Sequence, residues 1–199
     1  MKYNGPKVRL SRKLGIALTT KADKYRERKP YPPGQHGMRR RRRMSNYGMQ
    51  LLEKQRLRYQ YNVSERQMGN YFKKASGMKG VVGDNLIMLL ETRLDSVVHR
   101  AGFAPTIYAA RQFVGHGHIM VNGKKVDVPS YQVRANEVVS IREKSQKLRM
   151  FNENRVAVTL PPYISVAESG YEATVQHLPP RDEVPVVCEV QLVIEYYSR

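Results

Sequence analysis

The chain concentrates its positive charge at its N-terminal end, and this imbalance limits what that end can form by itself. Residues 1–44 hold fifteen Lys or Arg against two acids, which places thirteen of the eighteen net positive charges in less than a quarter of the 199 residues. This stretch has little periodic apolar patterning, and it contains Lys29-Pro-Tyr-Pro-Pro-Gly34, which is incompatible with a helix. Five arginines, Arg39–Arg43, follow. The sequence therefore predicts an extended or loosely ordered arm that folds against an anionic partner.

A solvated tail or a localisation signal would also be basic. The arm differs from a bare charge run because aromatic and turn-forming residues interrupt its cations, namely Tyr25, Tyr31, Pro33 and Gly34, and this favours a shaped loop. The whole chain is 41% hydrophobic and 26% charged, which is ordinary for a globular protein. A net charge of +18 favours a polyanionic partner, of which nucleic acid is the commonest. An anionic membrane is disfavoured because we see no basic amphipathic helix with a broad apolar face.

The cysteine content and the N-terminus indicate the compartment. The single cysteine, Cys188, excludes an internal disulfide and a cysteine-rich zinc site, and it is typical of a reducing environment. No run approaches about 18 consecutive apolar residues, and the N-terminus lacks the apolar core of a signal peptide. We therefore expect a soluble, cytoplasmic protein.

Helical patterns follow the arm. Ser45 is a plausible N-cap for a helix over 49–60 that carries Lys54, Arg56 and Arg58. Ser64-Glu-Arg-Gln67 has the form of a capping box, and the next helix has its apolar residues on one stripe, at Met68, Tyr71, Phe72 and Ala75. Glycines at 77, 80 and 83 then predict a domain boundary at 83/84.

The pattern from residue 84 predicts two helices followed by an antiparallel sheet. Asp84 can cap a first helix whose apolar stripe is Leu86, Leu90, Leu94, Val97, Val98 and Ala101. Thr106 can cap a second helix, which Gly115 and Gly117 end. Asn122-Gly123 is a strong hairpin signal after a strand that begins at His118, and Val138–Ile141 supplies another strand. The predicted class is α+β, with a domain over 84–183 and a core module over 91–145.

The pattern weakens beyond residue 145. A helix is a candidate over 147–154, and two strands are candidates over 163–166 and 171–177. The last segment, CEVQLVIEYYSR, is apolar enough to dock as a strand or as a short helix, and local pattern does not decide between them.

The motif Gly115-His-Gly-His118 invites a metal-site interpretation. On a strand His116 and His118 would face the same side, but no third or fourth ligand has suitable spacing, so we predict no metal and no cofactor. Phosphate-loop, HExxH and G-x-S-x-G motifs are absent, and Ser76-Gly-Met-Lys79 lacks the companion elements of an S-x-x-K enzyme. We predict neither an enzyme nor a small-molecule substrate.

The remaining interpretation is RNA binding by polar residues that lie off the apolar stripe. Arginine can pair with phosphate or stack on a base, lysine supplies a mobile charge, and Gln or Asn can read base edges or ribose hydroxyls. For Asn122 a turn-forming role alone is an equally open explanation. The candidates in the module are Arg93, Arg100, Thr106, Arg111, Gln112, His116, His118, Asn122, Lys124 and Lys125. Those before it are Arg9, Arg12, Lys13, Arg28, Lys29, His36, Arg39, Arg40, Arg41, Arg42, Arg43, Tyr47, Lys54, Arg56 and Arg58.

Several of these residues form a pattern that resembles a known RNA-binding module. Arg93-Leu-Asp95, Arg100, Thr106, Ala110-Arg-Gln112, Val114, His118-Ile119 and Val121-Asn-Gly123 match the module named after small-subunit ribosomal protein 4. The match extends to Pro32-Pro-Gly-Gln-His-Gly37, Tyr47-Gly48, Leu52-Glu-Lys-Gln55 and Ile194-Glu-Tyr-Tyr-Ser-Arg199. Over nearly its whole length the chain is therefore similar to the bacterial-type small ribosomal subunit protein 4 family.

The resemblance implies a specific role and architecture. Members of this family are structural constituents of the 30S subunit that bind a junction in the 5′ domain of 16S rRNA and nucleate assembly of the subunit body. They adjoin ribosomal protein 5 and influence translational accuracy, and messenger RNA is a further candidate partner. The implied fold has a basic helical N-terminal domain over 1–83, on which a C-terminal segment over 184–199 packs, and an α+β RNA-binding domain.

The sequence departs from the family pattern at two places. Many relatives bind zinc through an N-terminal cysteine cluster, which this chain lacks, so we expect RNA to order the basic arm instead. A basic residue usually follows the capping Thr, and here Ile107 stands there, so we expect Arg111 to carry more of the RNA contact. Two alternatives to a junction-binding ribosomal protein are an RNA-modifying enzyme, for which neither flank offers a catalytic domain, and a DNA-compacting protein.

Overall fold

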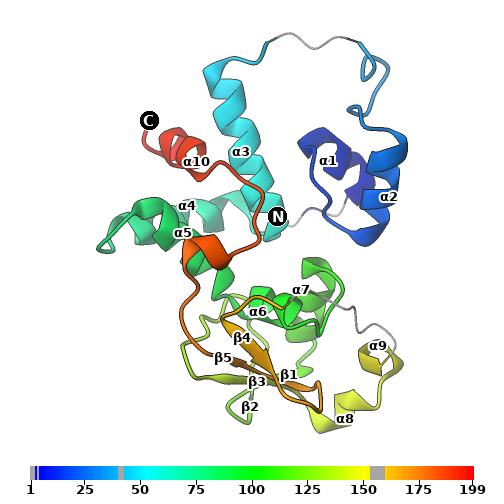
Figure 1. Ribbon diagram of the computed structural model, residues 1–199, viewed down its shortest axis with the longest axis vertical. Helices are drawn as coiled ribbons and strands as arrows, with labels where there is room; N and C mark the ends of the chain where they lie inside the picture. Colours follow the sequence, from blue (N-terminus) through cyan, green and yellow to red (C-terminus); the bar gives the residue numbers. More distant parts are fainter. Residues whose placement is uncertain (1–2, 4, 40–42, 153–159) are drawn as a thin grey trace. The chain divides into compact units, whose positions relative to one another are not determined.

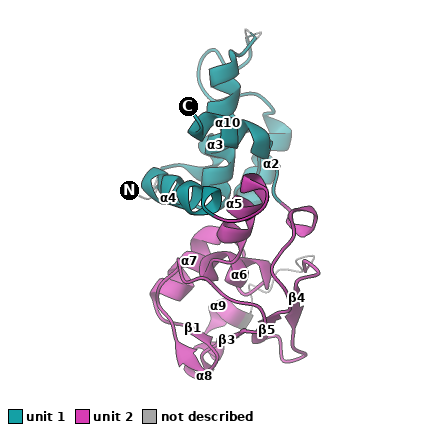
Figure 2. Cartoon of the chain, turned by 90° about the vertical axis from the view of Figure 1, so that its left-hand side faces the viewer, with its two compact units in different colours: residues 1–77, 186–199 teal, residues 78–185 magenta. Residues whose placement is uncertain are grey.

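The computed structural model describes residue 3 and residues 5–39, 43–152 and 160–199. They form two compact units, coloured separately in Figure 2. Unit 1 comprises Met1–Gly77 with Val186–Arg199, and unit 2 comprises Met78–Pro185. Unit 1 is helical where described, and unit 2 combines helices with a five-stranded antiparallel sheet, so the predicted α+β class is confirmed.

The first two helices of unit 1 lie within the basic arm. Helix α1 (Lys7–Leu14) ends at Gly15, whose φ of 72° allows its N–H to donate to the Ser11 carbonyl at 2.9 Å. Helix α2 (Thr20–Arg28) begins after Thr19, whose hydroxyl accepts from the Ala22 N–H. The prediction of an extended arm is therefore wrong for these residues. Its error was to overlook a small apolar set that becomes buried, namely Leu10, Leu14, Ile16, Leu18 and Ala22.

Helices α3 (Asn46–Gln60) and α4 (Glu65–Ser76) begin where their caps predicted. The Ser45 hydroxyl accepts from the Gly48 N–H at 3.2 Å, and Ser64 and Gln67 form a reciprocal capping box. Both caps are confirmed, because each satisfies N–H groups that the first turn of a helix leaves without intrahelical partners.

The last segment of the chain forms helix α10 (Val190–Tyr197), which packs on α3 and α4 within unit 1. Polar contacts fix its position: Gln50 Nε2 donates to Glu195 at 2.9 Å, and the Tyr197 hydroxyl donates to Glu65 at 2.8 Å. The Tyr197 ring also stacks on Phe72 at 5.0 Å between centroids. Of the two alternatives that the sequence left open for this segment, a strand or a short helix, the structure shows the helix.

The continuous helix expected from residue 84 is two helices, α5 (Val82–Glu91) and α6 (Leu94–Arg100). Asp84 lies inside the first turn of α5 and is not its cap, which is Val81. The predicted stripe is nevertheless buried at all six positions. The break falls at Thr92 and Arg93, so Arg93 and Arg100 do not lie on one continuous helix.

Hydrogen bonds to a neighbouring loop cause this break. The Leu94 N–H donates to the Tyr131 carbonyl and the Val133 N–H donates to the Thr92 carbonyl, each at 2.8 Å. Beside them the Arg93 guanidinium binds both carboxylate oxygens of Asp95, at 2.9 and 2.6 Å, and both side chains are fully buried. The backbone at Arg93 is thus extended and pairs with Gln132 in place of continuing the helix, and the Arg93 side chain forms a buried ion pair.

The sheet of unit 2 has the order β2-β1-β3-β5-β4 with all neighbours antiparallel. Its strands are β1 (Ile119–Val121), β2 (Lys124–Lys125), β3 (Val138–Ile141), β4 (Ile164–Val166) and β5 (Glu172–Val175). Figures 1 and 2 show α6 and α7 (Ile107–Gly115) on one side of it. The Asn122-Gly123 hairpin is confirmed, since positive φ at both residues (48° and 76°) suits the turn between β1 and β2.

Short elements complete unit 2. Helices α8 (Glu143–Gln146) and α9 (Arg149–Asn152) follow β3, and the 3₁₀ turn η1 (Arg181–Glu183) follows β5. The helix expected over 147–154 is confirmed for 149–152, and residues 153 and 154 lie outside the described residues. The strands expected over 163–166 and 171–177 are confirmed as β4 and β5.

Replacing Arg93 with Ala should destabilise unit 2 strongly. The substitution leaves Asp95 buried without its bidentate partner, and loss of one member of a buried pair costs about 3–5 kcal/mol. Urea unfolding followed by circular dichroism measures this, with exposed Arg134→Ala as a control expected within about 0.5 kcal/mol of the parent protein. Equal stability of the two variants would contradict a structural role for Arg93.

Candidate nucleic-acid interface

The junction between α7 and β1 gathers polar side chains around a glycine. Helix α7 ends at Gly115 and His116, and Gly117 turns the chain with a φ of 73°. A Cβ built on Gly117 would lie 2.2 Å from Lys125 Cε, so the lysine stem crosses directly over this residue. The backbone conformation favours glycine here, and a larger residue would also require the end of the Lys125 side chain to move.

His118 is held in place by aromatic and polar neighbours. Its ring contacts Phe113 and Phe151, with centroids 6.4 and 5.7 Å away, and Nδ1 lies 2.9 Å from the Ser145 hydroxyl. The His116 ring is 6.0 Å away. Burial lowers the pKa of His118, and the positive charges of His116 and Arg142 lower it further. His118 is therefore a half-buried support, while the exposed His116 faces solvent.

Arg142 completes what we call the junction cluster, defined as His116, His118, Lys125 and Arg142. Its N–H donates to the His118 carbonyl at 2.9 Å, and its side chain is exposed. We did not predict Arg142, although its place directly after the strand at 138–141 was a usable signal. Exposed Lys144 and Lys147 follow on and after α8, and sequence reasoning missed them as well.

Two predicted RNA contacts of unit 2 have structural duties. The Asn122 carboxamide oxygen accepts from the Val138 N–H at 2.9 Å, which ties the hairpin turn to β3. The Thr106 hydroxyl accepts from the Ala109 N–H, so Thr106 caps α7 as predicted. Gln112, Lys124 and Lys125 are exposed and can reach a ligand.

Three of the predicted RNA contacts, Arg93, Arg100 and Arg111, are mostly turned inward. Arg93 is fully buried, and its assignment to the RNA-contacting surface is wrong for this structure. Arg100 donates to Glu91 at 2.5 Å, and Arg111 lies 3.5 Å from Asp95; their side chains keep 19% and 12% of their surface exposed. Glu91 is itself fully buried and also accepts from the Tyr163 hydroxyl at 2.6 Å. These arginines neutralise buried carboxylates and reach solvent only with their edges.

In unit 1 the Arg12 guanidinium organises the loop that follows α2. It donates to the carbonyls of Lys29, Tyr31 and Pro32 at 3.1–3.3 Å, and it lies over the Tyr31 ring at 4.9 Å. Contacts within the protein therefore order this part of the arm, which corrects the expectation that RNA alone does so. We call these contacts the Arg12 clamp.

The cations of α3 are also engaged inside unit 1. Lys54 is buried, pairs with Glu65 at 2.9 Å and lies over the Tyr196 ring, so its assignment as an RNA contact is wrong. Arg56 donates to the Leu14 carbonyl at 2.8 Å and to Glu53 at 2.5 Å. Arg58 pairs with the same Glu65 at 3.2 Å. Arg56 and Arg58 are half-buried and connect helices first.

The remaining candidates of unit 1 are exposed: Arg9, Lys13, Arg28, Lys29, His36, Arg39, Arg43 and Tyr47. Arg40, Arg41 and Arg42 lie outside the described residues. Arg199 lies over the Tyr47 ring at 5.8 Å, which places one more cation beside an exposed aromatic face.

Neither a metal centre nor a membrane segment is found in the part of the chain that the structure describes. His, Cys, Asp and Glu do not gather there in groups of three or more that could hold a metal ion. None of its helices has the length and apolar character needed to cross a bilayer.

Comparisons with known proteins identify the family to which the chain belongs. A model described as "Ribosomal protein S4/S9 N-terminal domain" matches residues 2–91, and a model described as "S4 domain" matches residues 92–139. The "Small ribosomal subunit protein uS4" of Thermobifida fusca is 50% identical over all of both chains. That of Micrococcus luteus is 52% identical over 96% of this chain and 95% of its own, and that of Brevibacillus brevis is 47% identical over 100% and 99%. The chain belongs to the uS4 ribosomal protein family.

The two family models together match residues 2–139 of this uS4-family chain, and the boundary between them does not coincide with that between the units. The N-terminal model runs to residue 91, the end of α5, whereas unit 2 begins at Met78. The S4 domain match ends at residue 139, inside β3. Arg142 and the strands β4 and β5 therefore lie outside the matched module, although they share its sheet.

Removing the Arg12 side chain should loosen the loop that it clamps. In Arg12→Ala the three carbonyls lose their donor, and we expect amides over 29–37 to exchange with solvent about tenfold faster in RNA-free protein. Hydrogen–deuterium exchange measures this, and Arg9→Ala, an exposed change on the same helix, is the control. Unchanged protection in Arg12→Ala would contradict the clamp. Loss of protection in the parent protein on adding a metal chelator would also contradict it, because a bound metal would then order the loop.

Acid should destabilise unit 2 through His118. Because its pKa is lowered in the folded state, the neutral form is favoured there, so its contribution is present above the unfolded-state pKa of about 6.5 and is lost as pH falls below it. We expect Tm to fall between pH 7.5 and 5.5, and to fall less in His118→Gln. Half-buried His99, whose pKa burial also lowers, accounts for part of the remaining dependence of Tm on pH. Exposed His36→Gln is the control, and equal slopes in all three proteins would contradict this role.

Proposed function

We propose that this chain, by its family a structural constituent of the small ribosomal subunit and not an enzyme, is a primary 16S rRNA-binding protein. Its expected target is the junction in the 5′ domain, where early binding nucleates assembly of the subunit body. One observation carries the proposal: the described cations divide into buried ones, which neutralise the protein's own carboxylates, and exposed ones, which have a polyanion as their natural partner.

The division is clear in unit 2. Glu91 and Asp95 are fully buried and are paired with arginines, so these two acids do not offset the positive charge of the surface. The exposed side includes His116, Lys125 and Arg142 around the α7–β1 junction. Neutralising several phosphates with such side chains yields affinity that falls steeply with salt. The imidazole and guanidinium groups can also stack on the unpaired bases that an RNA junction presents.

A role in translational accuracy and a place beside small-subunit protein 5 belong to the same proposal. They rest on membership of the uS4 family and on the resemblance of the chain to that family over nearly its full length. Binding to messenger RNA is a weaker extension, because the exposed cations suit any single-stranded or junction-containing RNA. Misreading measured in cells whose ribosomes carry variants of this chain would test the accuracy role.

The binding role can be tested with a variant that spares the buried arginines. We expect His116→Ala, Lys125→Ala and Arg142→Ala together to weaken binding to a 5′-domain fragment of 16S rRNA. The salt dependence, plotted as log K against log salt, should become shallower by roughly 0.9 per lost phosphate contact, or about two units for the Lys and Arg. Filter binding between 50 and 200 mM salt measures both quantities.

A matched control removes charge elsewhere on the same unit. Lys79→Ala with Arg134→Ala takes away two exposed cations outside the junction cluster and should leave the affinity within about twofold. Similar losses in both variants would show that only total charge matters. Equal affinity of the parent protein for duplex DNA of the same length would contradict recognition of a junction and favour a DNA-compacting protein.

A further inference from the structure

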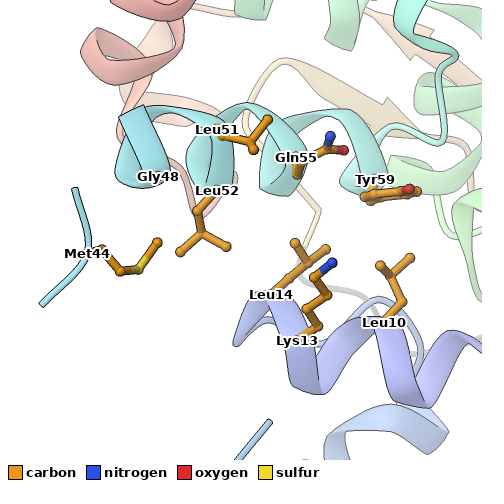
Figure 3. Close-up of a pocket in the computed structure, with 9 residues that line it drawn as sticks. All are labelled: Leu10, Lys13, Leu14, Met44, Gly48, Leu51, Leu52, Gln55 and Tyr59. Carbon is orange, nitrogen blue, oxygen red and sulfur yellow. The ribbon is translucent and has the colours of Figure 1, made fainter. Parts of the chain in front are cut away.

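An apolar pocket of about 360 Å³ opens between α1 and α3 of unit 1. Figure 3 shows Leu10 and Leu14 rising from α1, with Leu52 and Tyr59 facing them from α3. Met44 closes one end; it is 41% exposed, and Leu52 and Tyr59 are half-buried. The volume of the pocket lies in the range of small-ligand sites, about 300–1,000 Å³.

The edge of this pocket is polar and positively charged. Lys13 stands beside Leu14 on α1, and Gln55 lies on α3, so both ammonium and carboxamide groups border the apolar walls. The nine lining residues include no acid. Along α3 the nearby Glu53 is already paired with Arg56 at 2.5 Å. A ligand here therefore meets apolar walls within a positive field.

We propose that this pocket receives one unstacked nucleobase of the bound RNA. A base has apolar faces and a polar edge, which suits walls made of leucine and a rim made of Lys13 and Gln55. Its phosphates remain outside, where Arg9, an exposed cation of α1, and Arg43, an exposed cation three residues before the start of α3, are available to them. This assignment rests on the proposed function and adds a specific docking point to it.

Charge distinguishes a base from an apolar side chain of a neighbouring protein. Helix α1 contains four cations and no acid, so any peptide that docks there must tolerate or complement strong positive charge. A nucleotide brings the required negative charge with it, on the phosphate that the ribose links to the base entering the pocket. The RNA that the rest of the chain recruits is therefore the occupant that the observations favour.

The test fills the pocket and asks which RNA base responds. Leu52→Trp places an indole between α1 and α3, and Leu178→Trp, at an exposed position of unit 2, is the matched control. Base-reactive chemical probing of the 5′-domain fragment is carried out with the parent protein and with each variant. We expect Leu52→Trp to restore reactivity at one protected unpaired base, to leave the rest of the footprint unchanged and to lower affinity about tenfold.

A second variant and a crosslink keep the test decisive. If circular dichroism shows that Leu52→Trp is misfolded, Lys13→Met takes its place, because Lys13 is exposed, and it should expose the same base. A benzophenone side chain introduced at position 52 should crosslink to that base in assembled subunits. Crosslinking to a protein instead, or an unchanged footprint with affinity within twofold, overturns the pocket assignment alone. Failure of the parent protein to bind the fragment overturns the proposed function, and the pocket assignment with it.

Discussion

Unit 2 depends on the ion pairing of the buried Asp95 carboxylate with Arg93 and Arg111. Arg93 binds both of its oxygens and Arg111 approaches one of them at 3.5 Å, so the two arginines neutralise the buried charge. Burial alone raises the pKa of Asp95, and the two arginines oppose that effect. This arrangement fixes the start of α6, holds α7 beside it and sets the backbone at Arg93 against the loop at Gln132. A hydrophobic core alone would not specify that break in the helix.

In unit 1 guanidinium groups also bind polar groups inside the protein, here backbone carbonyls instead of carboxylates. Arg12 satisfies three backbone carbonyls of a proline-rich loop, and Arg56 satisfies the last carbonyl of α1, so guanidinium groups replace the hydrogen bonds that these segments cannot make for themselves. Arginine suits this role because its planar fork carries five donors and keeps its charge at any physiological pH. A strongly basic chain can therefore use some of its cations as internal scaffolding and still present a positive surface.

The sequence predicted best where local chemistry determines local structure. The caps at Ser45, Ser64 and Thr106 and the turn at Asn122 were correct because their partners lie within three or four residues, or in the next strand. It failed where tertiary packing buries a cation: Arg93 is enclosed together with its near neighbour Asp95, and Lys54 is covered by Glu65 and by the ring of the distant Tyr196. Amphipathic spacing placed α5 and α6 on one stripe but could not show the loop pairing that divides them. Three of the four residues of the junction cluster were predicted from the sequence, and Arg142, which lies in a different part of the sequence, was not.

The place of α10 has a consequence for how the protein is made. Unit 1 combines segments from both sides of unit 2 in the sequence. Gln50, Glu53 and Lys54 of α3 therefore contact residues of the segment 189–196, which a ribosome synthesises after unit 2. At about 5–20 residues per second, all of Met78–Pro185 must emerge first, which takes on the order of 5–20 s. During that interval unit 2 can fold as a self-contained module, while the basic N-terminal helices remain incomplete. Synthesis of α10 is therefore the step that completes unit 1.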